Sequence, residues 1–308
     1  MEAFGYAGKI LKVDLSTGNV AEQSTLDYAD KWLGGRGIAS RLYWDEVPPQ
    51  VTAFDPENAL ILATGPLAGI PRLGGSRWVA CGKSPATSPE HFSPANLGGR
   101  WGLSLKSAGY DALFIQGKAE KPVSLFLHDG MVGIKDASAF WGKGAIETRE
   151  GLKAEMGGRV GVAAIGPAGE NRATMATILA DDDASGAAGL GAVMGSKNLK
   201  AIVVQPVRRQ MKVAHPERLR ELLEYFRGLG FELMSAVGNL QFRITGPGTR
   251  KTPCHGCLGN CLRRTYEAKD GRKGKFMCQS ATFYQAMAEG YYGPGHDIPF
   301  QATNLCDD

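Results

Sequence analysis

Three cysteines at close spacing are the residues of this sequence best suited to metal chemistry. Cys254, Cys257 and Cys261 follow a C-x2-C-x3-C pattern, and thiolates gathered in this way are soft ligands for an iron–sulfur cluster or for zinc. Gly256 and Gly259 between them permit a tight loop. We interpret the segment as an iron–sulfur site. Because such clusters usually take four cysteines, a fourth ligand has to come from elsewhere.

Two other readings of the cysteine loop stay open at this point. A zinc site would use His255 or a later cysteine as its fourth ligand. Three neighbouring buried thiols without a metal form the second alternative.

Composition narrows the class of protein. The 308 residues, 43% hydrophobic and 21% charged with a net charge of +4, are ordinary for a globular protein of two domains. Six cysteines without an apolar signal segment predict reduced thiols or metal ligands, hence a cytoplasmic location. No run is long enough to span a bilayer, so we expect no membrane association. Basic residues after the cysteine loop lack the interleaved aromatics of a nucleic-acid surface and could attract an acidic electron-transfer partner.

The order of expected elements predicts an α+β fold with two domains. Residues 1–206 contain many short strands separated by glycine loops, which predicts a β-rich domain. From Pro216 the apolar residues recur at helical spacing, so residues 207–308 are expected to begin an α-helical domain. The sequence ends at Asp308 without a helix stop signal, and we expect a C-terminal half to be missing.

The glycine loops point to a bulky anionic ligand. Loops around Gly75, Asn96 and Gly189 could turn backbone N–H groups toward phosphate, and we expect them to open onto one concave face. The stretch from Gly186 to Gly195 is expected to be such a loop. It is not a dinucleotide fingerprint, because Met194 stands where the last glycine should be.

Several of these motifs together resemble one family. GGSR at 74–77, ANLGG at 95–99, IGPAGEN at 165–171 and GAVMGSKNLKAI at 191–202 occur in the order found in aldehyde ferredoxin oxidoreductases, as do the cysteine loop and NLCDD at 304–308. The similarity spans nearly the whole chain and is weakest between Val207 and Thr252. It implies a tungsten or molybdenum enzyme with two pyranopterins, a [4Fe–4S] cluster, and a β-rich saddle domain beneath the pterins.

The resemblance assigns roles to individual residues. Arg77 matches an arginine between cluster and pterin, while Asn96 and Gly98 match residues that contact the pterin phosphates and a bridging Mg²⁺. The carbonyl of Ala184 matches a second magnesium contact. Asp307 matches the first aspartate of a pterin-binding motif.

The same resemblance assigns the cysteines. Cys254, Cys257 and Cys261 match three ligands of the cluster. Cys278 resembles, by its position, the cysteine of class II benzoyl-CoA reductase catalytic subunits and their relatives that is a protein ligand to tungsten. Its alternatives are a buried free thiol and the fourth cluster ligand.

Two departures from the family pattern stand out. The usual R-A-A-G-R is replaced by Asp183-Ala184-Ser185-Gly186-Ala187, which removes two arginines that face phosphate. The successive acids Asp181 to Asp183 would repel phosphate there. Gln279, next to Cys278, stands where aldehyde oxidoreductases carry an acid.

The resulting functional hypothesis is the N-terminal part of a bispterin oxidoreductase. It would act on an aldehyde or acyl-CoA-type substrate and pass electrons through the cluster to ferredoxin or a partner subunit. A homodimer is compatible with this hypothesis. The alternative is a non-catalytic scaffold that carries pterin or cluster and transfers electrons.

Overall fold

The structure, a computed structural model, divides the chain into two compact units. It describes residues 4–70, 73–128, 130–157, 159–181, 184–207 and 211–228, and then short segments at 250–252, 255–256, 264–267, 271, 273–276, 286–293, 298, 301–302 and 305. The first unit consists of Met1–Ile70, Gly75–Ala214 and Asp308, and the second of Pro71–Gly74 and His215–Asp307. Helices and mixed sheets together confirm the expected α+β class.

The first sheet of the first unit has six strands. They are β1 (Lys9–Asp14), β2 (Val20–Ser24), β3 (Leu60–Thr64), β4 (Trp78–Ser84), β5 (His91–Leu97) and β6 (Ala112–Gln116). Their order is β2-β1-β6-β3-β4-β5, in which only β1 and β6 run parallel. Strand β5 is therefore an edge strand.

The second sheet repeats this topology strand for strand. It contains β7 (Val123–His128), β8 (Met131–Asp136), β9 (Gly161–Ala164), β10 (Ile178–Ala180), β11 (Ala184–Gly186) and β12 (Leu199–Val204). Their order is β11-β10-β9-β12-β7-β8, and the one parallel pair is again formed by the first and last strands of the set. Here β11 takes the edge position that β5 has in the first sheet.

Sequence and backbone details show the same duplication. Helix α3 (Trp101–Ser107) precedes β6, and α6 (Leu190–Ser196) precedes β12, and the two helices have the same length. A Gly-Pro pair follows both β3 and β9, at Gly65-Pro66 and Gly166-Pro167. Gly99 and Ala188, at matching places before the two helices, both have positive φ. The unit is thus built from two similar halves.

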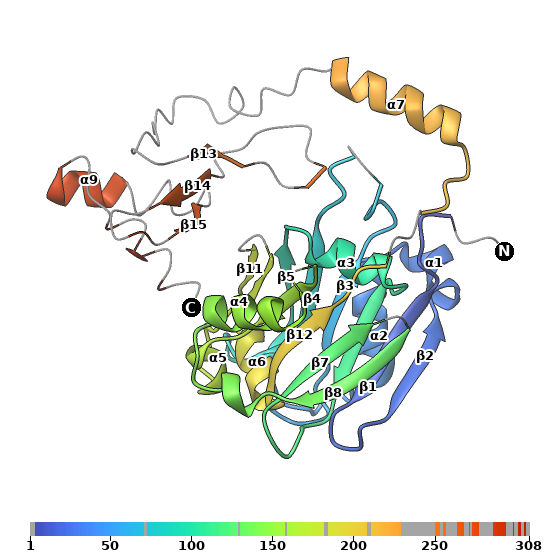
Figure 1. Ribbon diagram of the computed structural model, residues 1–308. Coiled ribbons are helices and arrows are strands. Elements are labelled where there is room, and N and C mark those ends of the chain that lie inside the picture. Colours follow the sequence, from blue (N-terminus) through green and yellow to red (C-terminus); the bar gives the residue numbers. More distant parts are fainter. Residues whose placement is uncertain are drawn as a thin grey trace. The chain divides into compact units, whose positions relative to one another are not determined.

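Three apolar clusters hold the first unit together. The largest lies between the two sheets and includes Trp78, Trp101 and Ile202. Helix α2 (Arg36–Glu46) covers the other face of the first sheet through Ile38 and Leu42. Helix α4 (Ala145–Glu155) covers the other face of the second sheet, as Figure 1 shows. The remaining elements are α1 (Leu26–Trp32), α5 (Pro167–Glu170) and the short 3-10 helix η1 (Ser138–Phe140).

The second unit contains a small sheet that the sequence did not predict. Helix α7 (Pro216–Gly228) agrees with the expected apolar period, and α9 (Ala286–Tyr292) lies near the end of the chain. Strands β13 (Arg250–Lys251), β14 (Arg264–Glu267) and β15 (Lys273–Phe276) form an antiparallel sheet in that order. In the part of the chain that the structure describes, no helix is both long and apolar enough to cross a bilayer.

The expected loop at 186–195 is wrong, because most of it is helix α6. Its glycines serve packing inside the protein. A Cβ atom on Gly195 would lie 1.9 Å from the carbonyl oxygen of Gly169, and one on Gly191 would lie 2.2 Å from that of Thr177. Gly189 is buried and has a φ of 65°, and its Cβ would meet Thr174. This segment therefore does not open toward a ligand.

Substituting Gly195 by Ala should destabilise the first unit. The new methyl group would push α6 away from α5, and overpacking of this kind costs about 1–3 kcal/mol. The gain in helix propensity, about 1 kcal/mol, opposes only part of that loss. The matched control is Gly133→Ala in β8, where nothing lies within 4 Å of the added Cβ. Denaturant unfolding should show a lower midpoint for Gly195→Ala alone, and equal midpoints would contradict the packing argument.

Candidate cofactor-binding site

The edge strands of the two sheets, β5 and β11, lie against one another. Strands β5 and β11 contact one another and are drawn side by side in Figure 1. Gly186 on β11 packs so tightly against Leu97 on β5 that an added Cβ would lie 2.8 Å from a Leu97 methyl carbon. The glycine thus permits this close approach, and both predicted phosphate-contacting segments belong to these two strands.

Three predicted residues gather at one end of the β4–β5 pair. Trp78 pairs with Leu97 and Val79 with Asn96, so Arg77, just before β4, and Gly98, just after β5, lie at the same end. Asn96 and Arg77 are exposed, whereas Gly98 is buried. The cofactor roles that the family resemblance assigns to these three residues stay predictions.

The backbone around Gly98 is fixed by a buried tryptophan. The indole Nε1 of Trp78 donates a hydrogen bond of 2.8 Å to the Gly98 carbonyl. The Trp78 ring also packs on Trp101 at 4.5 Å between centroids. A rigid, well-packed turn at Gly98 is what a backbone-mediated anion site needs.

The acidic run before Ala184 is less repulsive than its sequence suggests. Asp181 is buried, where its carboxylate accepts a 2.8 Å hydrogen bond from the N–H of Val162 and pairs with Lys153. Its charge is therefore compensated within the second sheet and α4. Ala184 pairs with Ala180 on β10, and its side chain is buried. Asp182 and Asp183 lie outside the described residues.

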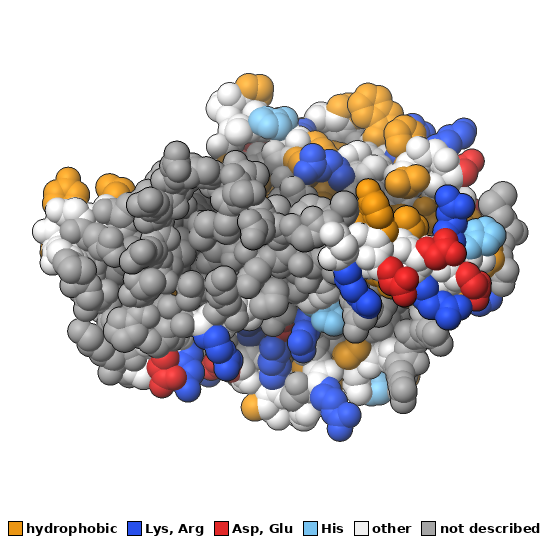
Figure 2. All heavy atoms as spheres, turned by 90° about the horizontal axis from the view of Figure 1, so that it is seen from above, with side chains coloured by type: hydrophobic (Ala, Val, Ile, Leu, Met, Phe, Trp, Pro, Cys, Tyr) orange, Lys and Arg blue, Asp and Glu red, His pale blue; other side chains and the backbone are white. Residues whose placement is uncertain are grey.

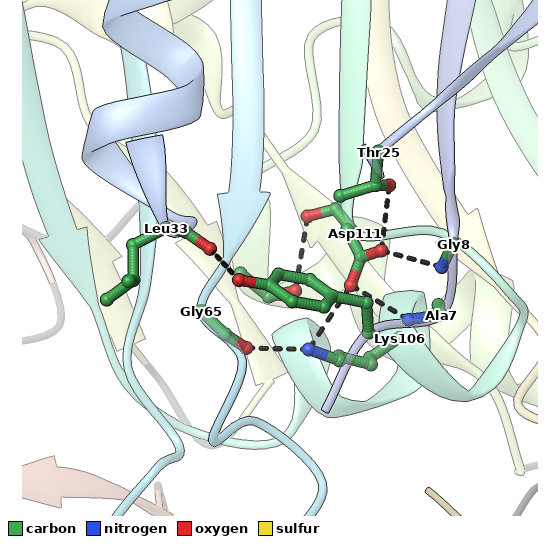
Figure 3. Close-up of polar contacts among 9 residues, drawn as sticks. Ala7, Gly8, Thr25, Leu33, Gly65, Lys106 and Asp111 are labelled. Atoms are coloured by element: carbon green, nitrogen blue, oxygen red, sulfur yellow. Dashed lines mark hydrogen bonds and ion pairs between the residues drawn. The ribbon is translucent and has the colours of Figure 1, made fainter. Parts of the chain in front are cut away.

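A buried carboxylate organises the end of the first sheet where these residues lie (Figure 3). Asp111, directly before β6, accepts hydrogen bonds from the N–H groups of Ala7 and Gly8 at 3.0 and 2.8 Å, and from the Thr25 hydroxyl at 2.8 Å. Its carboxylate also lies 3.2 Å from the ammonium of Lys106, and both side chains are almost fully buried. The charge is thus fully partnered.

Lys106 extends this network to the end of β3. Its ammonium donates to the Gly65 carbonyl at 2.6 Å and lies 5.6 Å from the centre of the Tyr6 ring. Burial lowers the pKa of Lys106 below its ordinary value, and the Asp111 carboxylate raises it. The Tyr6 hydroxyl in turn donates to the Leu33 carbonyl at 2.5 Å, just before α2.

The second half also has a buried ion pair at the corresponding place. There the residue at the start of the last strand is a lysine instead of an aspartate. Lys200 on β12 corresponds to Asp111, because its carbonyl accepts a hydrogen bond from the N–H of Ile165 as that of Asp111 does from Thr64. The Lys200 ammonium pairs with Glu170 at 2.5 Å. It also donates to the Lys143 carbonyl at 2.7 Å. Each half therefore secures the start of its last strand with one buried charge pair.

In the second unit, the small sheet brings the ends of the cysteine-containing segments together. Lys251 pairs with Arg264, and Arg264 pairs with Phe276. The sequence places Cys254 three residues after Lys251, Cys261 three before Arg264, and Cys278 two after Phe276. Two or three residues span at most roughly 7–11 Å of extended chain. All three cysteines are therefore connected to the same end of one sheet.

The predicted metal ligands themselves lie outside the described residues. These are Cys254, Cys257, Cys261 and Cys278, and the same holds for the pterin-motif residue Asp307. Within the described segments, no group of three or more His, Cys, Asp or Glu side chains could hold a metal ion. Next to the cysteine loop, His255 is exposed, and the Gly256 carbonyl accepts a 2.9 Å hydrogen bond from the N–H of Gly74.

The distribution of charged side chains over the described surface bears on nucleic-acid binding. On the face shown in Figure 2, basic and acidic side chains are interspersed rather than gathered in one continuous stripe. This distribution on the visible face does not favour a nucleic-acid surface.

Comparison with known proteins identifies the family. The profile described as "Aldehyde ferredoxin oxidoreductase, N-terminal domain" matches residues 10–206, the part that forms both sheets. The chain belongs to the aldehyde ferredoxin oxidoreductase family. This confirms the resemblance inferred from the glycine and cysteine motifs.

Two individual relatives show how far along the chain the similarity extends. A tungsten-containing aldehyde ferredoxin oxidoreductase of Pyrococcus abyssi is 47% identical over 223 residues, which cover 71% of this chain and 36% of the relative. The WOR-like subunit of an aliphatic sulfonate oxidoreductase of Pyrococcus furiosus is 36% identical and matches 72% of this chain and 38% of its own length. The chain thus spans little more than a third of these relatives.

A solved structure is similar over nearly the whole chain. It is the active-site complex BamBC of benzoyl coenzyme A reductase with 1,5-dienoyl-CoA, with a TM-score of 0.80 and 28% identity. The match covers 99% of this chain and 55% of that one. This family member is of the class that the cysteine at position 278 suggested.

The main features missed from the sequence are the duplicated halves and the Asp111 network. The repeat had a sequence signal in the Gly-Pro pairs at 65–66 and 166–167. Asp111 had no such signal. Its partners Ala7 and Thr25 lie far from it along the chain, and nearby Lys106 belongs to no distinctive sequence pattern.

Replacing Asp111 by Asn should strongly destabilise the first unit. Lys106 would keep a buried charge without its carboxylate, and breaking a buried pair in this way costs about 3–5 kcal/mol. Asp30→Asn is the control, because Asp30 is exposed and the same charge is removed; its effect should stay within about 0.5 kcal/mol. Thermal and urea unfolding would measure both. A loss no greater than that of the control would show that Asp111 does not organise this end.

Proposed function

We propose that the complete protein is a tungsten- or molybdenum-bispterin oxidoreductase and that this chain supplies the base for its cofactor. The observation that carries the proposal is the contact of β5 with β11, because Asn96 lies on β5, Gly98 directly follows it, and Ala184 lies on β11. A cofactor with two similar pterin halves suits a surface made from two similar halves of a protein.

The described residues fit the phosphate end of such a cofactor. The exposed amide of Asn96 offers a neutral oxygen ligand of the kind that Mg²⁺ accepts. The exposed guanidinium of Arg77 offers paired donors to an anion. In the proposed complex, the Ala184 carbonyl would be a second oxygen ligand for Mg²⁺, and Asp307 would contact a pterin.

The cofactor would supply two-electron redox chemistry at its metal, and the protein would supply placement and hydrogen bonds. Cys254, Cys257 and Cys261 would hold a [4Fe–4S] cluster that accepts electrons one at a time. Ferredoxin or a partner subunit would receive them. An aldehyde or acyl-CoA-type substrate fits the relatives' names, and a cytoplasmic location fits the reduced thiols that such a cluster requires.

Cys278 is proposed as a ligand of the pterin-bound metal. A thiolate is a suitable soft ligand for tungsten or molybdenum, and it would occupy a coordination position and donate electron density to the metal. The register of the small sheet supports a position near the cysteine loop. That position also suits a fourth cluster ligand, so the two roles need an experiment that separates them.

Metal content should reveal the cluster and the cofactor together. Complete protein purified without oxygen should contain tungsten or molybdenum and about four iron atoms for each cluster. Cys254→Ser should lower iron. Cys81→Ala is the control, because Cys81 is buried in the first sheet, where burial raises its pKa to about 12 and suits an unreactive thiol. Stoichiometric zinc without iron would contradict the proposal, and iron without tungsten or molybdenum would favour the electron-transfer scaffold.

Cys278→Ser should alter the pterin-bound metal and spare the cluster. With the thiolate replaced by a harder oxygen ligand, X-ray absorption at the tungsten or molybdenum edge should show one fewer sulfur neighbour. Iron content should match that of the unmodified protein. If iron falls and the metal-edge spectrum is unchanged, Cys278 is instead the fourth ligand of the cluster.

A further inference from the structure

Arg36 lies against the proposed cofactor residue Asn96. Its Nη2 atom is 3.5 Å from the Asn96 side-chain oxygen, although the two residues are far apart in sequence. Asn96 pairs with Val79, whose side chain belongs to the apolar cluster under α2. Because cross-strand partners point to the same face of a sheet, the Asn96 amide lies on the face that α2 covers.

Close backbone packing fixes the first turn of α2 and thereby the start of the Arg36 side chain. The N–H of Gly35 donates to the Thr64 carbonyl at 2.9 Å, which ties the helix start to the end of β3. A Cβ atom on Gly37 would lie 2.2 Å from the carbonyl oxygen of Trp32, and one on Gly34 would lie 3.0 Å from Pro66. Larger residues at these positions would displace Arg36.

The charge of Arg36 is available for a ligand. Among the residues that the structure describes, Arg36 forms no ion pair, and its side chain is exposed. Arg41 on the same helix differs, because it pairs with Asp45 at 2.6 Å and lies over the Trp32 ring. A contact of 3.5 Å to a neutral amide leaves most of the five guanidinium donors of Arg36 unused.

We propose that Arg36 binds a phosphate group of the cofactor next to Asn96 and so supplies positive charge at this edge of the first sheet. The inference rests on the proposed function and names a residue that its motif-based assignments do not contain. The charge is needed because residues 183–187, Asp-Ala-Ser-Gly-Ala, offer no basic side chain to an anion. Guanidinium and phosphate form bidentate, charge-assisted hydrogen bonds, whereas Asn96 alone offers only a neutral dipole.

The test measures cofactor retention rather than turnover. Complete wild-type protein, Arg36→Gln, Arg36→Lys and the control Arg41→Gln would be purified anaerobically. Each would be dialysed against inorganic phosphate as a competitor. Tungsten or molybdenum would be followed by elemental analysis, and released pterin by its fluorescence after oxidation. Thermal unfolding of the cofactor-free proteins would verify that each variant folds.

Arg36→Gln should lose pterin and metal roughly 10- to 100-fold faster than wild type, as expected for the loss of a charge-assisted contact. Arg36→Lys should fall between them, because a lysine keeps the charge without the planar fork. Arg41→Gln should behave like wild type. Equal retention by wild type, Arg36→Gln and Arg41→Gln would overturn this inference alone. Wild-type protein without any pterin would overturn the proposed function and this inference with it.

Discussion

The buried pair of Lys106 and Asp111 is the contact on which the proposed site depends most. Asp111 fastens the N-terminal segment and Thr25, while Lys106 holds the carbonyl of Gly65 at the end of β3. Two charges removed from water are tolerated here because every oxygen of the carboxylate is hydrogen-bonded. The same end of the sheet carries Arg36 and Asn96, so the pair fixes the backbone from which these side chains extend.

Duplication explains why the two edge strands are a natural place for this cofactor. Each half ends its strand order in an edge strand, β5 or β11, and each secures its last strand with one buried ion pair. Edge strands carry unpaired backbone groups that a polar ligand can satisfy. The close approach of Leu97 and Gly186 joins the two edges into one surface.

Local sequence patterns predicted much of this structure, whereas contacts between residues far apart in the sequence were not predicted. The family, the α+β class and the helix at Pro216–Gly228 followed from motifs, alternation and helical spacing. The helix at Leu190–Ser196 did not, because its glycines weaken helix propensity and only the packing of Gly195 on Gly169 explains them. The contact of Arg36 with Asn96 joins the start of α2 to β5, and no spacing rule reaches across such a distance. The roles of Arg77, Ala184 and the four cysteines remain predictions.

The location of the metal tests the central claim most directly. Crystals of the complete protein, grown without oxygen, would be measured on both sides of the tungsten or molybdenum absorption edge. The account predicts one strong anomalous peak above the joined edges of β5 and β11, with the cofactor phosphates next to Asn96. An anomalous peak elsewhere in the protein, or these edges covered by protein segments instead of cofactor, would contradict it.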